Sequence, residues 1–195
     1  IHCKLKKYNF CYHVLSRINL KYCLGKKVVI SIMSDYCTSS SSYPLDGVSI
    51  HQLNKFVDDC GGRSAFNGKT TEDINNEIQK PLTSTKKVSY CDYLKEKNPQ
   101  SAKIKKANVF ISHAWQYKFL DVVDAINQQF QDESDVIVWF DLFSVNQHMT
   151  NNTEPDYWAT SFKNAIKEIG RVVVILSPWN NPIPFTRAWC LWEIY

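Results

Sequence analysis

The sequence lacks the two features that would direct a protein to a membrane or out of the cell. It contains no run of about 18 apolar residues, the length that a membrane-spanning helix requires. It also shows no small-residue cleavage pattern of the kind that ends a secretory signal. We therefore expect a cytoplasmic protein without a membrane partner.

Close cysteine pairs are absent as well. The seven cysteines include no CxxC motif and show no clustered Cys/His spacing. Structural zinc sites need convergent ligands, and a disulfide framework needs a secreted context. His148 and Asp141 are seven residues apart and form only a weak metal or acid/base pattern, and Asp141 equally suits the turn after a strand. We predict no metal site.

Acidic residues are missing from residues 1–32, which carry seven of the 23 lysines and arginines. This segment accounts for the net charge of +4, and the part expected to fold shows no basic cluster of the kind that binds nucleic acid. The segment is compatible with a mitochondrial presequence, but lysine outnumbers arginine six to one, and the first methionine is Met33. We interpret residues 1–32 as a non-native or disordered leader that folds into nothing.

Residues 33–100 predict a small, mostly helical region followed by a linker. One helix is expected within 47–62, where the two glycines at its end are typical helix terminators. A second is expected to begin at Thr70 or Thr71 and to end at Pro81. Residues 89–97 suit one or two further helical turns, and the polar, basic stretch 97–106 suits a linker.

From residue 107 on, short apolar runs alternate with helical periodicity. The runs are apolar on both faces, which predicts buried parallel strands covered by helices on both sides. We predict an α/β fold with a flavodoxin-like parallel sheet in the order 2-1-3. The pattern stops inside a third helix, so the domain at 101–195 is expected to be truncated there. The predicted strands are 107–112, 135–140 and 171–176, and the predicted helices are 117–130, 158–169 and a third from about Thr186.

Topology places a candidate site at the carboxyl ends of these strands. Open parallel sheets bind ligands where the winding direction reverses, here between the first and third strands. The loops at 112–115 and 177–188 meet there, and the third helix would direct backbone N–H groups to the same place. Glu193 follows Cys190 by three residues and Trp189 by four, so the three share a helix face.

Three stretches resemble TIR (Toll/interleukin-1 receptor-like) domains. NVFISHAW at 108–115 resembles their first strand and loop, and FKNAIKEIGRVVVILSPW at 162–179 resembles their second helix and third strand. RAWCLWEI at 187–194 resembles the WCxxE signature that opens the third helix of plant TIR domains. The resemblance covers about residues 107–195, in the right order and spacing. The loop after the second strand lacks the usual glycine and is long, and the loop before Trp189 is longer and proline-rich.

The resemblance implies an intracellular signalling domain that hydrolyses NAD, as substrate and not as cofactor, with Glu193 as the catalytic carboxylate. A carboxylate beside the ribose would stabilise the positive charge that develops when the nicotinamide–ribose bond breaks. The resemblance also implies self-association and binding to other TIR or signalling domains, with the loop from Asp141 to His148 closing over substrate and mediating assembly. The implied substrate-binding residues are Ser112, His113, Ala114, Trp115, Asp141, Trp189 and Cys190.

Simpler interpretations stay open for these residues. Glu193 is also compatible with a solvated helix position, Trp189 and Trp192 with core packing, and Cys190 with a small buried hydrophobe. His113 is equally compatible with a solvated loop.

Two other functions compete with NAD cleavage. A TIR-like module that only self-associates would be favoured by a crevice filled by Trp115 or Trp189. A phosphoacceptor domain would need paired acids at the end of the first strand, and residues 108–113 contain none. We therefore discount the phosphoacceptor.

Overall fold

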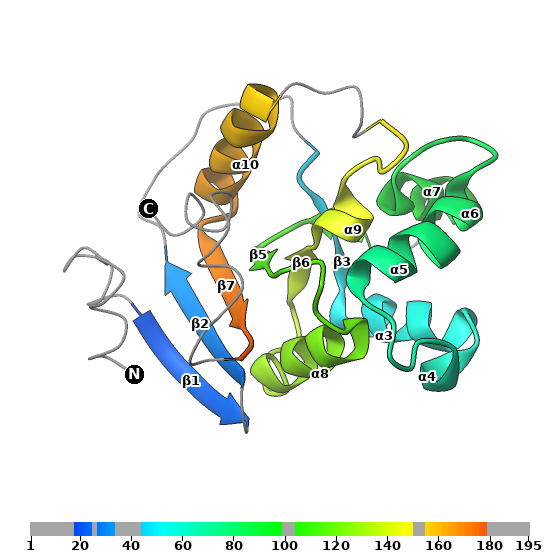
Figure 1. Ribbon diagram of the computed structural model, residues 1–195. Coiled ribbons are helices and arrows are strands. Elements are labelled where there is room, and N and C mark those ends of the chain that lie inside the picture. Colours follow the sequence, from blue (N-terminus) through cyan, green and yellow to red (C-terminus); the bar gives the residue numbers. More distant parts are fainter. Residues whose placement is uncertain (1–17, 25–26, 34–43, 99–103, 150–154, 179–195) are drawn as a thin grey trace.

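The computed structural model describes residues 18–24, 27–33, 44–98, 104–149 and 155–178 (Figure 1). Their strands form a single sheet of seven, in the order β1-β2-β7-β5-β6-β3-β4. β5 lies in parallel between β6 and β7, and the outer strands pair antiparallel. The fold is therefore α/β with a mixed sheet. The strands are β1 Ile18–Leu24, β2 Lys27–Met33, β3 Asp46–Ser49, β4 Ile104–Lys106, β5 Val109–Ser112, β6 Ile137–Trp139 and β7 Arg171–Leu176.

The three apolar runs predicted as strands all contain strands. Phe110 of β5 pairs with Trp139 of β6 on one side and with Val172 of β7 on the other. These three strands therefore lie side by side in the order β6-β5-β7, with the first of them along the chain in the middle. The prediction of a purely parallel sheet is wrong, because antiparallel strands extend this parallel centre on both edges.

Residues 18–33 correct the interpretation of the N-terminal segment. β1 and β2 form an antiparallel pair, and β2 pairs along the length of β7, with Val29 opposite Ile175. Val29 is buried with the core. The expectation that residues 1–32 fold into nothing is therefore wrong for β1 and β2. The scattered lysines concealed a run at 28–32 in which every residue except Ser31 is apolar and β-branched, and this run covers the edge of β7.

The expected linker and domain boundary are also corrected. β4 lies inside the predicted linker, and β3 is inserted between β4 and β6, so the region before residue 100 contributes to the same sheet. One continuous apolar core joins Val48 and Leu53 to Val109, Ile111 and Val138. Residues 44–98 and the part from residue 104 on therefore share one core.

Helices cover both faces of the sheet. Ile111, Phe140 and Val173 belong to the core cluster that includes residues of α3 and α8. The alternate residues Phe110 and Trp139 stack with ring centroids 4.5 Å apart, and Phe162 of α10 packs on both. Figure 1 shows α3 to α7 gathered on the β3 side of the molecule, away from β1 and β2. The helices are α3 Ile50–Asp59, α4 Gly62–Ala65, α5 Thr71–Ile74, the π-helical turn η2 Asn75–Gln79, α6 Lys80–Thr83, α7 Tyr90–Lys97, α8 Phe119–Gln129, α9 Asp141–Ser144 and α10 Pro155–Ile169.

Two of the helices begin directly after a residue whose side chain caps them. Ser49 caps α3 through its side chain, and Thr70 caps α5 in a reciprocal capping box with Asp73. The prediction that Pro81 ends this helix is wrong, because η2 and α6 continue α5 to Thr83. At η2 the Lys80 N–H donates to the Asn75 carbonyl, five residues back. This wider turn replaces a hydrogen bond to the fourth preceding residue by one to the fifth. It does so just before Pro81, which has no N–H to donate.

None of the helices in the described ranges combines the length and the apolarity needed to cross a membrane.

Candidate functional site

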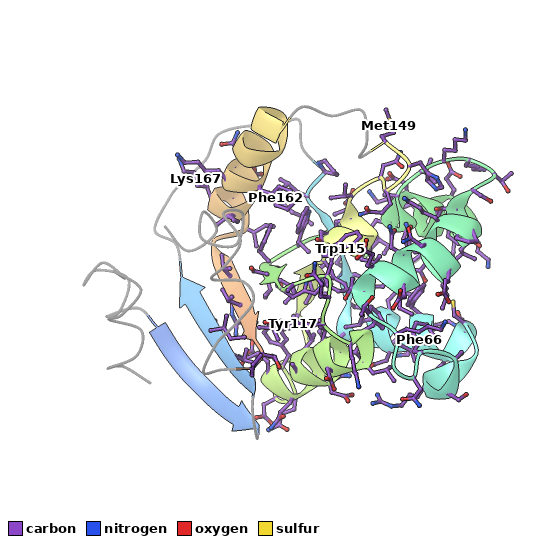
Figure 2. All side chains as sticks on the ribbon, in the orientation of Figure 1. Phe66, Trp115, Tyr117, Met149, Phe162 and Lys167 are labelled. Atoms are coloured by element: carbon purple, nitrogen blue, oxygen red, sulfur yellow. The ribbon has the colours of Figure 1, made fainter. Side chains whose placement is uncertain are left out.

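The loops that follow the three parallel strands are bound to one another at one edge of the sheet. The Trp115 indole N–H, in the loop after β5, donates to Asp141 Oδ2 after β6 at 2.5 Å. The Ser177 N–H, after β7, donates to Tyr117 Oη at 2.9 Å. Figure 2 labels Trp115 and Tyr117, the two aromatic residues that make these connections. The structure thus brings the predicted Trp115 and Asp141 together at the predicted edge.

Asp141 is also the first residue of α9, and its other atoms organise the loop that follows. Its Oδ1 accepts from the Leu142 N–H at 2.8 Å, and its carbonyl accepts from Gln147 Nε2 at 2.7 Å. Asp141 therefore orders the turn after β6 while it holds Trp115. No group of three or more potential metal ligands occurs among the described residues.

The residues at the end of β5 are buried, not solvated. Ser112, His113 and Ala114 are exposed by at most 6%. His113 Nε2 lies 3.2 Å from Thr71 Oγ1, and the His113 ring lies 4.8 Å from the Phe140 ring. The open interpretation of His113 as a solvated loop residue is therefore wrong. Its ring joins the sheet edge to the start of α5.

The start of α5 lies against the loop after β5, a contact that sequence reasoning missed. The N–H groups of Thr71 and Glu72 donate to the carbonyls of Tyr117 and Trp115 at 3.1 and 3.2 Å. Thr70 donates its N–H and its hydroxyl to Asp73 Oδ2, and these bonds lower the pKa of the Asp73 carboxyl. The capping box is visible in the sequence, but nothing local indicates which loop this helix contacts.

A second missed feature is the buried polar face of the helix at 71–83, formed by Thr71, Asn75, Gln79 and Thr83. These four side chains recur every four residues and are 0%, 4%, 0% and 1% exposed. Thr71 contacts His113, and Thr83 Oγ1 lies 2.8 Å from His148 Nε2 in the loop after α9. The polar face therefore extends from the β5 loop to the β6 loop. The four-residue spacing of polar side chains was the available signal.

His148 gives a pH-dependent test of this arrangement. Partial burial, followed by the positive charges of Lys80 and Lys87, lowers the pKa of His148 below its usual 6.5. The unfolded chain then binds the proton more tightly than the folded chain does. The stability contribution is therefore complete above about pH 6.5 and is lost as the pH falls toward the folded pKa.

We expect His148 to titrate below pH 6.5 in a histidine NMR titration. In urea unfolding, lowering the pH from about 7.5 to about 5.5 is expected to destabilise the wild type more than His148→Gln, which has no titrating ring. A His148 midpoint at or above 6.5, or equal pH dependence of the two proteins, would contradict the environment described.

The predicted residues Trp189, Cys190 and Glu193, and the third helix from Thr186, lie outside the described residues.

Comparisons with known proteins identify no family for this chain. No family model, no curated protein and no solved structure matches it. The TIR resemblance therefore depends on the residues of the chain itself.

Proposed function

We propose that this chain is a TIR-type signalling domain with a flavodoxin-like arrangement, and that it cleaves NAD at the nicotinamide–ribose bond through Glu193. The observation that supports the proposal is the meeting of the loops after β5, β6 and β7 at one edge. Open α/β sheets bind ligands at this edge. NAD is the substrate in this proposal, and no resident cofactor or metal is needed.

The chemistry requires a carboxylate beside the ribose. Nicotinamide leaves with the bonding electrons and becomes neutral, and the ribose carbon acquires oxocarbenium character. A carboxylate stabilises that charge until water attacks the sugar carbon and loses a proton. In the proposal Glu193 is this carboxylate, while Ser112 to Trp115, Asp141, Trp189 and Cys190 flank the substrate.

The path of the chain is compatible with this assignment. β7 runs parallel to β5, and its following residue Ser177 is bound to Tyr117 of the β5 loop. Ser177, the residue that follows β7, therefore lies at the same edge as the loops described above. Glu193 follows Ser177 by sixteen positions in the sequence.

A self-association module without chemistry is the second candidate, and one observation favours it. Trp115 is half-buried and its indole N–H is used by Asp141, so this ring occupies space between the β5 and β6 loops. In that case the same loops would present an assembly surface to another copy or to another TIR or signalling domain.

The two candidates differ in the fate of NAD. We expect the 195-residue chain, at a protein concentration high enough for self-association, to release nicotinamide from NAD. Glu193→Gln should lower this release about 100-fold, because it removes the charge that stabilises the transition state. Chromatographic measurement of nicotinamide, together with sedimentation analysis of assembly, tests this expectation.

Glu96→Gln is the matched control, since Glu96 is exposed on α7 and pairs with Lys86. It should release nicotinamide at the wild-type rate. Equal release by wild type and Glu193→Gln, or no release from folded and self-associated protein, would reject Glu193 as the catalyst. Self-association without release would leave the assembly module as the function.

A further inference from the structure

Two buried amide side chains at the carboxyl edge of the sheet have amide atoms without hydrogen-bond partners, although Asn75 Nδ2 donates to Asn76 Oδ1 at 3.5 Å. Within the described part of the chain, Gln79 is 0% exposed, and both its amide oxygen and its amide nitrogen lack a partner. Asn75, one turn earlier, is 4% exposed, and its Oδ1 lacks one too. A buried polar group without a partner costs about 1–3 kcal/mol, and folded proteins contain few of them. These two therefore need an explanation.

The position of Asn75 and Gln79 indicates that their unpartnered amide atoms are not an incidental packing defect. Asn75 and Gln79 occupy the middle of the buried polar face, between Thr71 at the His113 end and Thr83 at the His148 end. Both ends of this face are engaged by the loops that follow β5 and β6. The Gln79 amide and Asn75 Oδ1 are thus held, without partners, at the edge where the proposed site lies.

The π-helical turn keeps these residues on one face. In a regular α-helix each step of four residues rotates by about 40° beyond a full turn, so Thr83 would be about 120° from Thr71. The wider turn η2 begins at Asn75, ends at Gln79 and offsets part of this rotation. Single π-helical turns occur frequently at functional sites. Here the turn aligns the two amides between two hydroxyls that are already held in place.

The chemistry of the polar face selects the ligand. Its side chains are hydroxyls and amides, with imidazoles at its two ends, and the carboxylate of Asp141 is occupied by Trp115. A planar amide such as Gln79 offers one acceptor and two donor hydrogens, which a second carboxamide complements with one acceptor and two donor hydrogens of its own. A neutral carboxamide therefore matches the two amides directly, whereas the positive charges of Lys80 and Lys87 that would suit a phosphate act at the His148 end of the face.

We propose that Gln79, assisted by Asn75, binds the carboxamide of nicotinamide. The assignment rests on the proposed function, which makes nicotinamide a part of the substrate and a product. It assigns substrate recognition to a helix that lies outside the TIR-like stretch of the sequence. Gln79 binds the leaving group in this scheme and takes no part in bond cleavage.

Binding of nicotinamide itself tests the assignment without a requirement for catalysis. Calorimetric titration of the 195-residue chain should show saturable nicotinamide binding and weaker binding of nicotinic acid. The carboxylate of nicotinic acid lacks the donor hydrogens and would bury a charge without a partner. Gln79→Met, which keeps the volume and removes the amide, should weaken nicotinamide binding about tenfold or more.

Gln129→Met is the matched control. Gln129 is 4% exposed, and both its amide atoms also lack partners within the described residues. Gln129 is the last residue of α8 and precedes Phe130, on whose ring Arg171 stacks. Arg171 is the first residue of β7, so Gln129 lies at the edge of the sheet opposite to the carboxyl ends of the parallel strands. Gln129→Met should bind nicotinamide as the wild type does. Circular dichroism verifies that each variant is folded, and Asn75→Ala, expected to weaken binding as well, replaces Gln79→Met if the latter does not fold.

The outcomes separate this inference from the proposed function. Wild-type affinity in Gln79→Met, an equal loss in Gln129→Met, or no binding by folded wild type would overturn the role of Gln79 and indicate amides that serve only the structure. Glu193→Gln should bind nicotinamide normally while it loses NAD cleavage. Gln79-dependent binding without any NAD cleavage would reject the proposed function and keep this inference.

Discussion

Replacing Phe56 by alanine is expected to lower the free energy of unfolding by about 3–5 kcal/mol, the range for a fully buried phenylalanine. Phe56 is 0% exposed and lies at the centre of an aromatic cluster. Its ring centroid lies 4.9 to 6.1 Å from those of Phe66, Tyr90, Phe119 and Phe143. These partners come from α7, α8, α9 and the residue after α4, so the cavity would weaken contacts on both sides of residue 100.

Urea unfolding followed by tryptophan fluorescence measures this effect. All six tryptophans lie after residue 114, so a lower midpoint in this signal would show that a change at position 56 destabilises the C-terminal part. Leu82→Ala is the control, because Leu82 is 38% exposed, and we expect a change within about 0.5 kcal/mol. An unchanged tryptophan transition in Phe56→Ala would mean that the two parts unfold separately.

Gly47→Val is expected to cost about 3 kcal/mol or more, at the upper end of the range for overpacking. Gly47 lies in β3 between β4 and β6. A Cβ atom there would lie 2.4 Å from the Val138 carbonyl oxygen and 3.0 Å from Ala107 Cβ. Since the nearest atom belongs to the backbone of the neighbouring strand, the strand pairing itself must shift.

Gly68→Ala separates this steric effect from a general cost of losing glycine. Gly68 has a φ of +76°, and a Cβ atom added there would meet nothing within 4 Å, so only backbone strain opposes the substitution. We expect Gly68→Ala to cost about 1 kcal/mol. Similar midpoints for the two variants in urea unfolding would show that β3 does not approach β6 as closely as described.

The candidate site was predictable in part. The apolar runs placed Ser112 to Trp115 and Asp141 at the carboxyl ends of adjacent parallel strands, and Trp115 does meet Asp141 there. The hydrogen bonds of Thr71 with the β5 loop and of Thr83 with His148 were not predictable. Such contacts join positions more than 40 residues apart and depend on how the helix is packed, which no local pattern encodes.

The sequence by itself determined the local elements of this protein. Apolar runs gave β5, β6 and β7, and the threonines at 70–71 marked a helix start, because periodicity and capping depend on residues within a few positions of each other. Only the tertiary structure decided which strands pair. β2 joined β7, and β3 was inserted between β4 and β6, because each covers a strand edge that would otherwise leave its backbone groups unpaired.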